Sequence, residues 1–134
     1  MKTTRSGGAA ALVFLGLLGG ALVGCAPDFD HLEMTIDTTP PLAVSISPTD
    51  VAVPVGIAVG VTATPFDTSG EKMDTDVVLA LIPRNQQVIG VEASLDDRSF
   101  VVFGVGPGTT SITVEVDHQR QLEIPVTVKL QPTE

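Results

Sequence analysis

Aliphatic and polar residues alternate strictly near the end of the chain. The segment LEIPVTVKL (122–130) has an aliphatic residue at every second position, and SITVEVD (111–117) follows the same pattern. A period of two sends successive side chains to opposite faces of a β-strand, so both segments predict half-buried strands. The polar stretch DHQRQ (117–121) between them predicts the turn of a hairpin.

Shorter segments of the same kind occupy the rest of the chain after residue 42. They are LAVSIS (42–47), GIAVGVTATP (56–65), DVVLALIP (76–83), QQVIGVEAS (86–94) and SFVVFGV (99–105). Turn signals rich in Gly, Pro, Asp and Ser recur between the strands, and no segment has a convincing helical period. About seven short strands at spacings of roughly 8–12 residues predict an all-β fold, a β-sandwich.

The amino-terminal region has a different pattern. After the basic residues Lys2 and Arg5, the 15-residue run AAALVFLGLLGGALV (9–23) contains no charge. At about 1.5 Å per residue, a helix of this length falls short of a hydrocarbon core of about 30 Å, which disfavours a transmembrane anchor. A basic start, a short apolar run and a small residue at its end predict a cleaved secretory signal peptide over residues 1–24.

The end of this run, Leu22-Val23-Gly24-Cys25, resembles the lipobox of bacterial lipoproteins. The resemblance implies cleavage between Gly24 and Cys25, a diacylglycerol on the Cys25 sulfur and an acyl chain on the new amino terminus. Two or more chains hold a protein firmly to a membrane. The alternative is a buried free cysteine, which the abrupt change to the acidic, Pro-containing sequence GCAPDFD disfavours.

The residue after the cysteine bears on the location. In lipoproteins of this kind an Asp at that place favours retention at the inner membrane, and here the residue is Ala26. The resemblance therefore implies a lipid-anchored protein of the cell envelope, with the outer membrane favoured.

The charge balance is strongly acidic, with a net charge of −9 for the whole chain. Loss of Lys2 and Arg5 with the signal peptide leaves five basic residues against 16 acidic ones, a net charge of −11. Such a surface repels nucleic acid phosphates and anionic lipid headgroups. We therefore expect no nucleic acid partner, and we expect the acyl chains to provide the attachment to the membrane.

Residues 26–41, APDFDHLEMTIDTTPP, are acidic, contain proline and show no clean period. This composition predicts an extended tether in which His31 is solvated, and Pro40-Pro41 marks the start of the folded domain. The predicted organisation is a signal peptide (1–24), a lipidated cysteine with its tether (25–41) and a β-sandwich (42–131).

The order of residues in the domain resembles the bacterial Ig-like domain of group 2, the Big2 family, over about residues 42 to 130. The positions that carry the resemblance are Ile46 to Pro48, Val55-Gly56, Ala63-Thr64, Asp67 to Gly70, Gly106 to Val114 and Pro125 to Leu130. The family usually has a tryptophan in a central strand, whereas this chain has none, and Leu79 or a neighbour holds that place. The resemblance implies an Ig-like sandwich and a role in adhesion or cell-surface association.

The chain offers little for catalysis, and we expect no enzyme. His118 falls in a predicted turn, and no Ser-His-Asp set is at hand. The glycine cluster GVGPG (104–108) lacks the spacing, the helix and the lysine of a phosphate loop, so a turn between strands explains it.

One loop could hold a metal ion. The segment DTSGEKMDTD contains the four carboxylates of Asp67, Glu71, Asp74 and Asp76, and Ca²⁺ prefers several oxygen ligands in a flexible loop. The residues do not follow the EF-hand order, and a solvated loop is the alternative. No other cofactor is expected.

Two classes of function follow. The first is a membrane-anchored interaction, adhesion or spacer module with a protein partner at the cell envelope. The second is a domain that binds a small ligand, Ca²⁺ or a glycan at the cell surface. Glycan sites usually use exposed aromatic faces, and a chain without Trp or Tyr argues against them.

Overall fold

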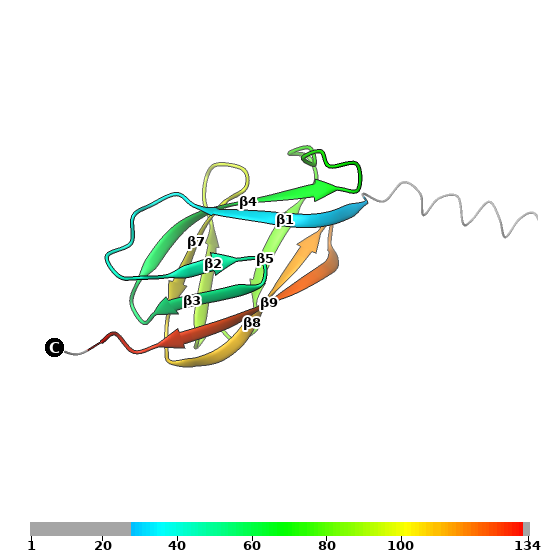
Figure 1. Ribbon diagram of the computed structural model, residues 1–134. Helices are drawn as coiled ribbons and strands as arrows, with labels where there is room; N and C mark the ends of the chain where they lie inside the picture. Colours follow the sequence, from blue (N-terminus) through cyan, green and yellow to red (C-terminus); the bar gives the residue numbers. More distant parts are fainter. Residues whose placement is uncertain (1–27, 133–134) are drawn as a thin grey trace, which may run out of the picture.

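Two β-sheets pack face to face in the computed structural model, which describes residues 28–132 (Figure 1). This part of the chain contains nine strands and no helix. The strands are β1 (Phe29–Ile36), β2 (Ser45–Ser47), β3 (Asp50–Pro54), β4 (Ala58–Asp67), β5 (Leu79–Pro83), β6 (Ile89–Ala93), β7 (Ser99–Gly104), β8 (Gly108–Val116) and β9 (Gln119–Lys129). The predicted all-β sandwich is confirmed. Because no helix occurs in these residues, none is long and apolar enough to cross a membrane.

The strand order is that of an immunoglobulin constant-type domain. One sheet has the order β1-β4-β7-β6, and the other has the order β2-β3-β9-β8-β5. These orders correspond to the ABED and GFC sheets of the immunoglobulin fold, with β3 added beside the last strand and β2 beside β3. Strand β3 runs parallel to β9, whereas the other described strand pairs are antiparallel.

The expected tether is wrong for about half of its length, because residues 29–36 form strand β1. This strand pairs with β4 in a register that joins Leu32 to Pro65 and Ile36 to Val61. Leu32 is only 3% exposed and belongs to the hydrophobic core. The backbone of β4 offers hydrogen-bonding groups along its edge, and β1 satisfies them, so the folded domain begins at Phe29 rather than at residue 42.

Inward-facing aliphatic side chains of both sheets form the core, as the alternation predicted. The fully buried members are Ile89, Ile112, Ile124, Val51, Val59, Val61, Val102, Val114, Val116, Val126, Val128 and Pro65. Leu81, in the middle of β5, is 6% exposed and contacts this cluster, whereas Leu79 is only partly buried. Leu81 is therefore the neighbour of Leu79 that fills the central core position.

The predicted hairpin at the end of the chain is confirmed. Strands β8 and β9 pair from Gly108–Val128 to Val116–Gln119. The two residues between the strands, Asp117 and His118, have φ values of 50° and 69°. Positive φ at both positions is the geometry of a type I′ turn, whose twist matches that of the flanking strands.

The two ends of the sandwich differ in charge. At the end where β1 begins, the connections carry six acidic residues, with Lys72 and Arg98 as the basic ones. These connections are linked to one another, because Arg98 donates to the Asp74 carbonyl at 2.6 Å and the Asp117 N–H donates to Val78 at 2.7 Å. Strand β9 finishes at the opposite end (Figure 1).

Candidate functional site

The predicted lipidation and cleavage residues, Cys25 and Gly24, lie outside the described residues. The description begins at Asp28, and β1 begins one residue later. Cys25 is therefore four residues from the first residue of the sandwich. A chain of four residues spans at most about 14 Å.

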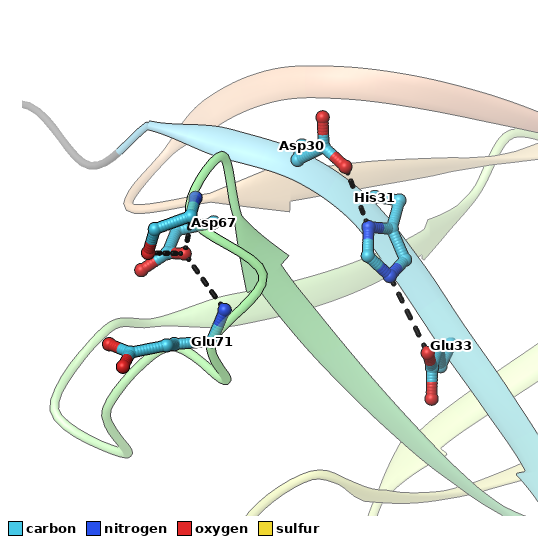
Figure 2. A network of polar contacts seen from close by, with 6 residues as sticks. Asp30, His31, Glu33, Asp67 and Glu71 are labelled. Atoms are coloured by element: carbon cyan, nitrogen blue, oxygen red, sulfur yellow. Dashed lines mark hydrogen bonds and ion pairs between the residues drawn. The ribbon is translucent and has the colours of Figure 1, made fainter.

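Asp67 closes the end of β4 by accepting hydrogen bonds from its own loop (Figure 2). Its carboxylate accepts from the Ser69 N–H at 2.9 Å, from the Ser69 hydroxyl at 2.6 Å and from the Glu71 N–H at 3.0 Å. These bonds, first that of the Ser69 hydroxyl and then that of the Glu71 N–H, lower the pKa of Asp67. Asp67 is thus a turn-forming residue that remains ionised.

Of the four carboxylates of the predicted Ca²⁺ site, Asp67, Glu71 and Asp74 border one hollow but do not converge closely enough to share an ion. Glu71, Asp74 and Asp76 are exposed, and Met73 between them is buried at 9% exposure. The hollow beneath the loop has a volume of about 250 Å³, and Lys72 lines it together with Asp67, Glu71 and Asp74. Within residues 28–132, no three His, Cys, Asp or Glu side chains come close enough to hold a metal ion.

Binding of Ca²⁺ by this loop stays a prediction, because Asp67 would have to exchange hydrogen bonds for a metal bond and the loop would have to close. A calcium titration followed by thermal unfolding tests it. A melting temperature that does not change at millimolar Ca²⁺ would remove the site.

His31 lies on β1 with a carboxylate at each ring nitrogen (Figure 2). Its Nδ1 lies 2.8 Å from Asp30 and its Nε2 lies 3.5 Å from Glu33, while the ring stacks on Phe66 of β4 with 4.8 Å between centroids. The hydrogen bond with Asp30 is the main cause that raises the pKa of His31, and Glu33 adds to it. The sequence predicted that His31 is solvated within a tether. The structure instead places it on strand β1, where its ring contacts Phe66 of β4.

A second polar network lies on the outer face of the β8–β9 hairpin. The Glu123 carboxylate accepts from the hydroxyls of Ser111 and Thr113, both at 2.8 Å. Arg84 lies 3.3 Å away and Arg120 lies 3.7 Å away. The two hydroxyl hydrogen bonds, first that of Ser111, lower the pKa of Glu123.

Neither network has the parts of a nucleophilic catalyst. Ser111 donates to Glu123, and the contacts of Glu123 include no histidine. The glycine cluster of residues 104–108 forms the connection from β7 to β8, as the sequence predicted. The networks instead fix strands to one another, β1 to β4 and β8 to β9.

The fold is similar to that of solved domains of the S-layer protein SbsC. The chain matches SbsC domains 4 and 5 with a TM-score of 0.53 and 20% identity over 78% of this chain and 54% of that one. For SbsC domains 5–6 the TM-score is 0.56 at 19% identity, over 81% of this chain and 47% of that one. The chain thus spans about half the length of these two-domain structures, and 14% of the structure of SbsC domains 1–6. At this level of identity the likeness concerns the fold. No protein-family model and no curated protein matches the chain.

Proposed function

We propose that the chain is a cell-envelope lipoprotein, anchored through lipid on Cys25, whose Ig-like domain is a non-catalytic interaction and adhesion module. The observation that carries this proposal is the position of β1. A strand that begins four residues after the lipobox cysteine puts the near end of the sandwich within about 14 Å of an acylated sulfur. Such an arrangement suits a module that presents its surfaces next to a membrane, and it leaves little length for a spacer.

The strand positions support membership of the Big2 family as part of this proposal. Ile46 to Pro48 begin in β2, Val55-Gly56 form the turn before β4, and Ala63-Thr64 lie within β4. Asp67 to Gly70 form the turn that ends β4. The likeness of the fold to S-layer domains agrees with a place at the cell surface. Ala26 favours the outer membrane as the site of anchoring.

The charge distribution supports attachment by lipid rather than by surface contact. Acidic residues dominate the end at which β1 begins, for example Asp28, Glu71 and Asp96. Anionic headgroups repel such an end over a Debye length of about 8–10 Å. Acyl chains on Cys25 would have to supply the affinity, because each buried methylene contributes about 0.8 kcal/mol.

The test compares the wild-type chain with Cys25→Ser in the native host. We expect wild-type protein to incorporate labelled fatty acid, to lose residues 1–24 and to fractionate with the membranes. Cys25→Ser should lose the label and keep residues 1–24. Ser6→Ala, in the basic start of the predicted signal peptide, serves as a control that should behave like wild type. If Cys25→Ser is still processed and stays with the membranes, the proposal is overturned.

A further inference from the structure

Strand β5 forms a sheet edge that is less protected than the other edges. The four edge strands are β1, β6, β2 and β5. Strand β1 contains Asp30 and Glu33, β6 contains Glu92, and β2 has only three residues. Strand β5 has the sequence LALIP, without a charged residue and without a register shift against β8. Charges, bulges, prolines and very short strands are the features that keep edges from pairing with other chains, and of these β5 has only Pro83 at its last position.

The free edge of β5 presents backbone groups in a defined pattern. The Arg84 N–H donates to the Ser111 carbonyl, and the Asp117 N–H donates to the Val78 carbonyl. Val78 and Arg84 flank β5, and both direct their backbone toward the β8–β9 hairpin. Because backbone groups alternate in direction along a strand, the N–H groups of Leu79 and Leu81 point away from β8. Within residues 28–132 no other strand pairs with this side of β5.

The last residue of β5 fits this pattern. Pro83 has no N–H, and by the same alternation its nitrogen faces the free edge, where a strand proline is tolerated. Its carbonyl remains available as an acceptor. The outward groups are therefore the donors of Leu79 and Leu81 and the carbonyls of those two residues and Pro83.

Apolar side chains accompany these groups. Ile82 is 40% exposed on the outer face of β5, and Val78 just before the strand is 47% exposed. A hollow of about 250 Å³ borders the start of the strand at Leu79, and another of about 260 Å³ borders its end at Pro83. Both ends of the edge therefore border hollows in the surface.

We propose that β5 pairs antiparallel with β5 of a second copy of this chain. In the register that overlaps the whole strand, Leu81 lies opposite Leu81 and Leu79 lies opposite Pro83. The N–H of each Leu81 then meets a Leu81 carbonyl, and the N–H of each Leu79 meets a Pro83 carbonyl. Every outward donor of both strands finds an acceptor, although proline has removed one donor from each edge.

The side chains and charges fit the same register. On the outer face, Ile82 of one copy packs on Ala80 of the other. This contact buries the exposed surface of Ile82. The acidic turn before β5, with Asp74 and Asp76, approaches the end of the other β5, where Arg84 is 56% exposed. Parallel pairing would bring like charges together instead.

The pairing has a consequence that rests on the proposed lipid anchor. Strand β5 starts near the end of the sandwich from which β1 emerges, since Val78 bonds to the Asp117 turn at that end. Antiparallel pairing therefore directs the anchored ends of the two copies in opposite directions. The pair would join two facing membranes, which is a form of adhesion.

The first experiment measures association of the whole chain in detergent by analytical ultracentrifugation. Three forms are compared: wild type, the double variant Ala80→Lys/Ile82→Lys, and Ala80→Glu/Ile82→Glu. In the proposed register residue 80 lies opposite residue 82, so each variant places two like-charge pairs face to face. We expect dimerisation to weaken by about tenfold or more in each variant alone and to return when the two variants are mixed.

Val101→Lys provides the matched control, because Val101 is 36% exposed on β7 in the centre of the other sheet. It should dimerise like wild type. Recovery on mixing also shows that both variants fold. A wild type that stays monomeric at all concentrations, or variants that associate as well as wild type, would overturn the pairing.

The second experiment separates the pairing from the anchor. Lipidated protein is placed on two vesicle populations of phosphatidylcholine, one with a donor dye and one with an acceptor dye. We expect vesicle clustering with wild type and with Val101→Lys, and none with Ala80→Lys/Ile82→Lys. If the anchor fails, the protein will not float with the vesicles, but it will still dimerise in detergent. If the pairing fails, the protein will float with the vesicles, but the vesicles will not cluster.

Discussion

The imidazole of His31 lies flat on the ring of Phe66, with an angle of 4° between the planes. The two residues are register partners, His31 on β1 and Phe66 on β4. The carboxylates of Asp30 and Glu33 flank the imidazole, so the protonated form is favoured and the pKa of His31 is raised. The ring stack therefore joins the first strand to the rest of its sheet, and the two carboxylates favour the charged form of the imidazole within it.

The attachment of β1 should weaken as the pH rises. A raised pKa means that the stabilisation is complete below the unfolded value of about 6.5 and is lost as the pH passes the higher folded value. We expect the amides of β1 to be better protected from hydrogen exchange at pH 6 than at pH 8, after correction for intrinsic rates. His31→Phe keeps an aromatic stack and removes the titration, so its protection should not follow this change. An equal pH dependence in His31→Phe would contradict the role of His31.

Leu32 distinguishes a structural strand from a tether. Its side chain is 3% exposed within the core cluster, so Leu32→Ala should cost about 2–5 kcal/mol of unfolding free energy. Leu130 is 70% exposed beyond β9, and Leu130→Ala should change stability by less than about 0.5 kcal/mol. Urea unfolding of both variants measures the difference. Equal, small effects would mean that β1 does not belong to the folded domain.

Most of the fold follows from the alternation of apolar residues, because a sandwich strand must bury one face. The hairpin of β8 and β9 was predictable for this reason. The same signal is present in β1, where Leu32, Met34 and Ile36 alternate with polar residues. Acidic residues and Pro27 obscured it, and its burial decreases along the strand until Ile36 is 40% exposed. An edge strand with a weak apolar face is hard to separate from a tether by sequence.

The polar networks could be predicted less well. The sequence shows that Asp67 lies in an acidic loop, but its hydrogen bonds to Ser69 and Glu71 depend on the direction of backbone N–H groups. Glu123 and Thr113 both fall on the polar face by alternation, yet only the register of β8 against β9 places them side by side. The sequence shows which residues carry charge, but it does not show which side chains and backbone groups they contact.

Gly104 occupies a place where two strands of different sheets approach. A Cβ at this position would collide with the backbone carbonyl of Pro54, which ends β3. The Gly104 N–H and carbonyl also bond to Ile57 and Gly56. Since backbone cannot move aside as a side chain can, Gly104→Ala should cost about 1–3 kcal/mol. Gly60→Ala, whose Cβ would meet the Thr38 methyl group at 3.1 Å and otherwise make ordinary side-chain contacts, should cost less in the same denaturant titration. The reverse order would contradict the close approach.

Replacement of one of the two residues of the β8–β9 turn should raise the stability of the domain. His118 has a φ of 69°, which costs an ordinary residue more than glycine, so His118→Gly should raise stability by about 0.5–1 kcal/mol. Asp117 also has positive φ, but its carboxylate accepts the Val78 N–H at 2.8 Å. Asp117→Gly should therefore give no gain. Thermal unfolding of the two variants measures this contrast, and a gain for Asp117→Gly alone would refute it.

We expect the ionised form of Glu123 to stabilise the domain, so that this stabilisation is lost at acid pH. The hydroxyls of Ser111 and Thr113 lower its pKa, and Arg84 and Arg120 contribute less. A lowered pKa means that the stabilisation is present above the unfolded value of about 4.3 and is lost as the pH falls through the folded value. Glu123→Gln should therefore melt at a lower temperature than wild type at pH 7, and the difference should shrink as the pH falls below the unfolded value. Glu92→Gln, on the exposed part of β6, should follow wild type at pH 7 and at pH 3. A melting difference that stays the same at pH 3 would show that charge on Glu123 does not stabilise the hairpin.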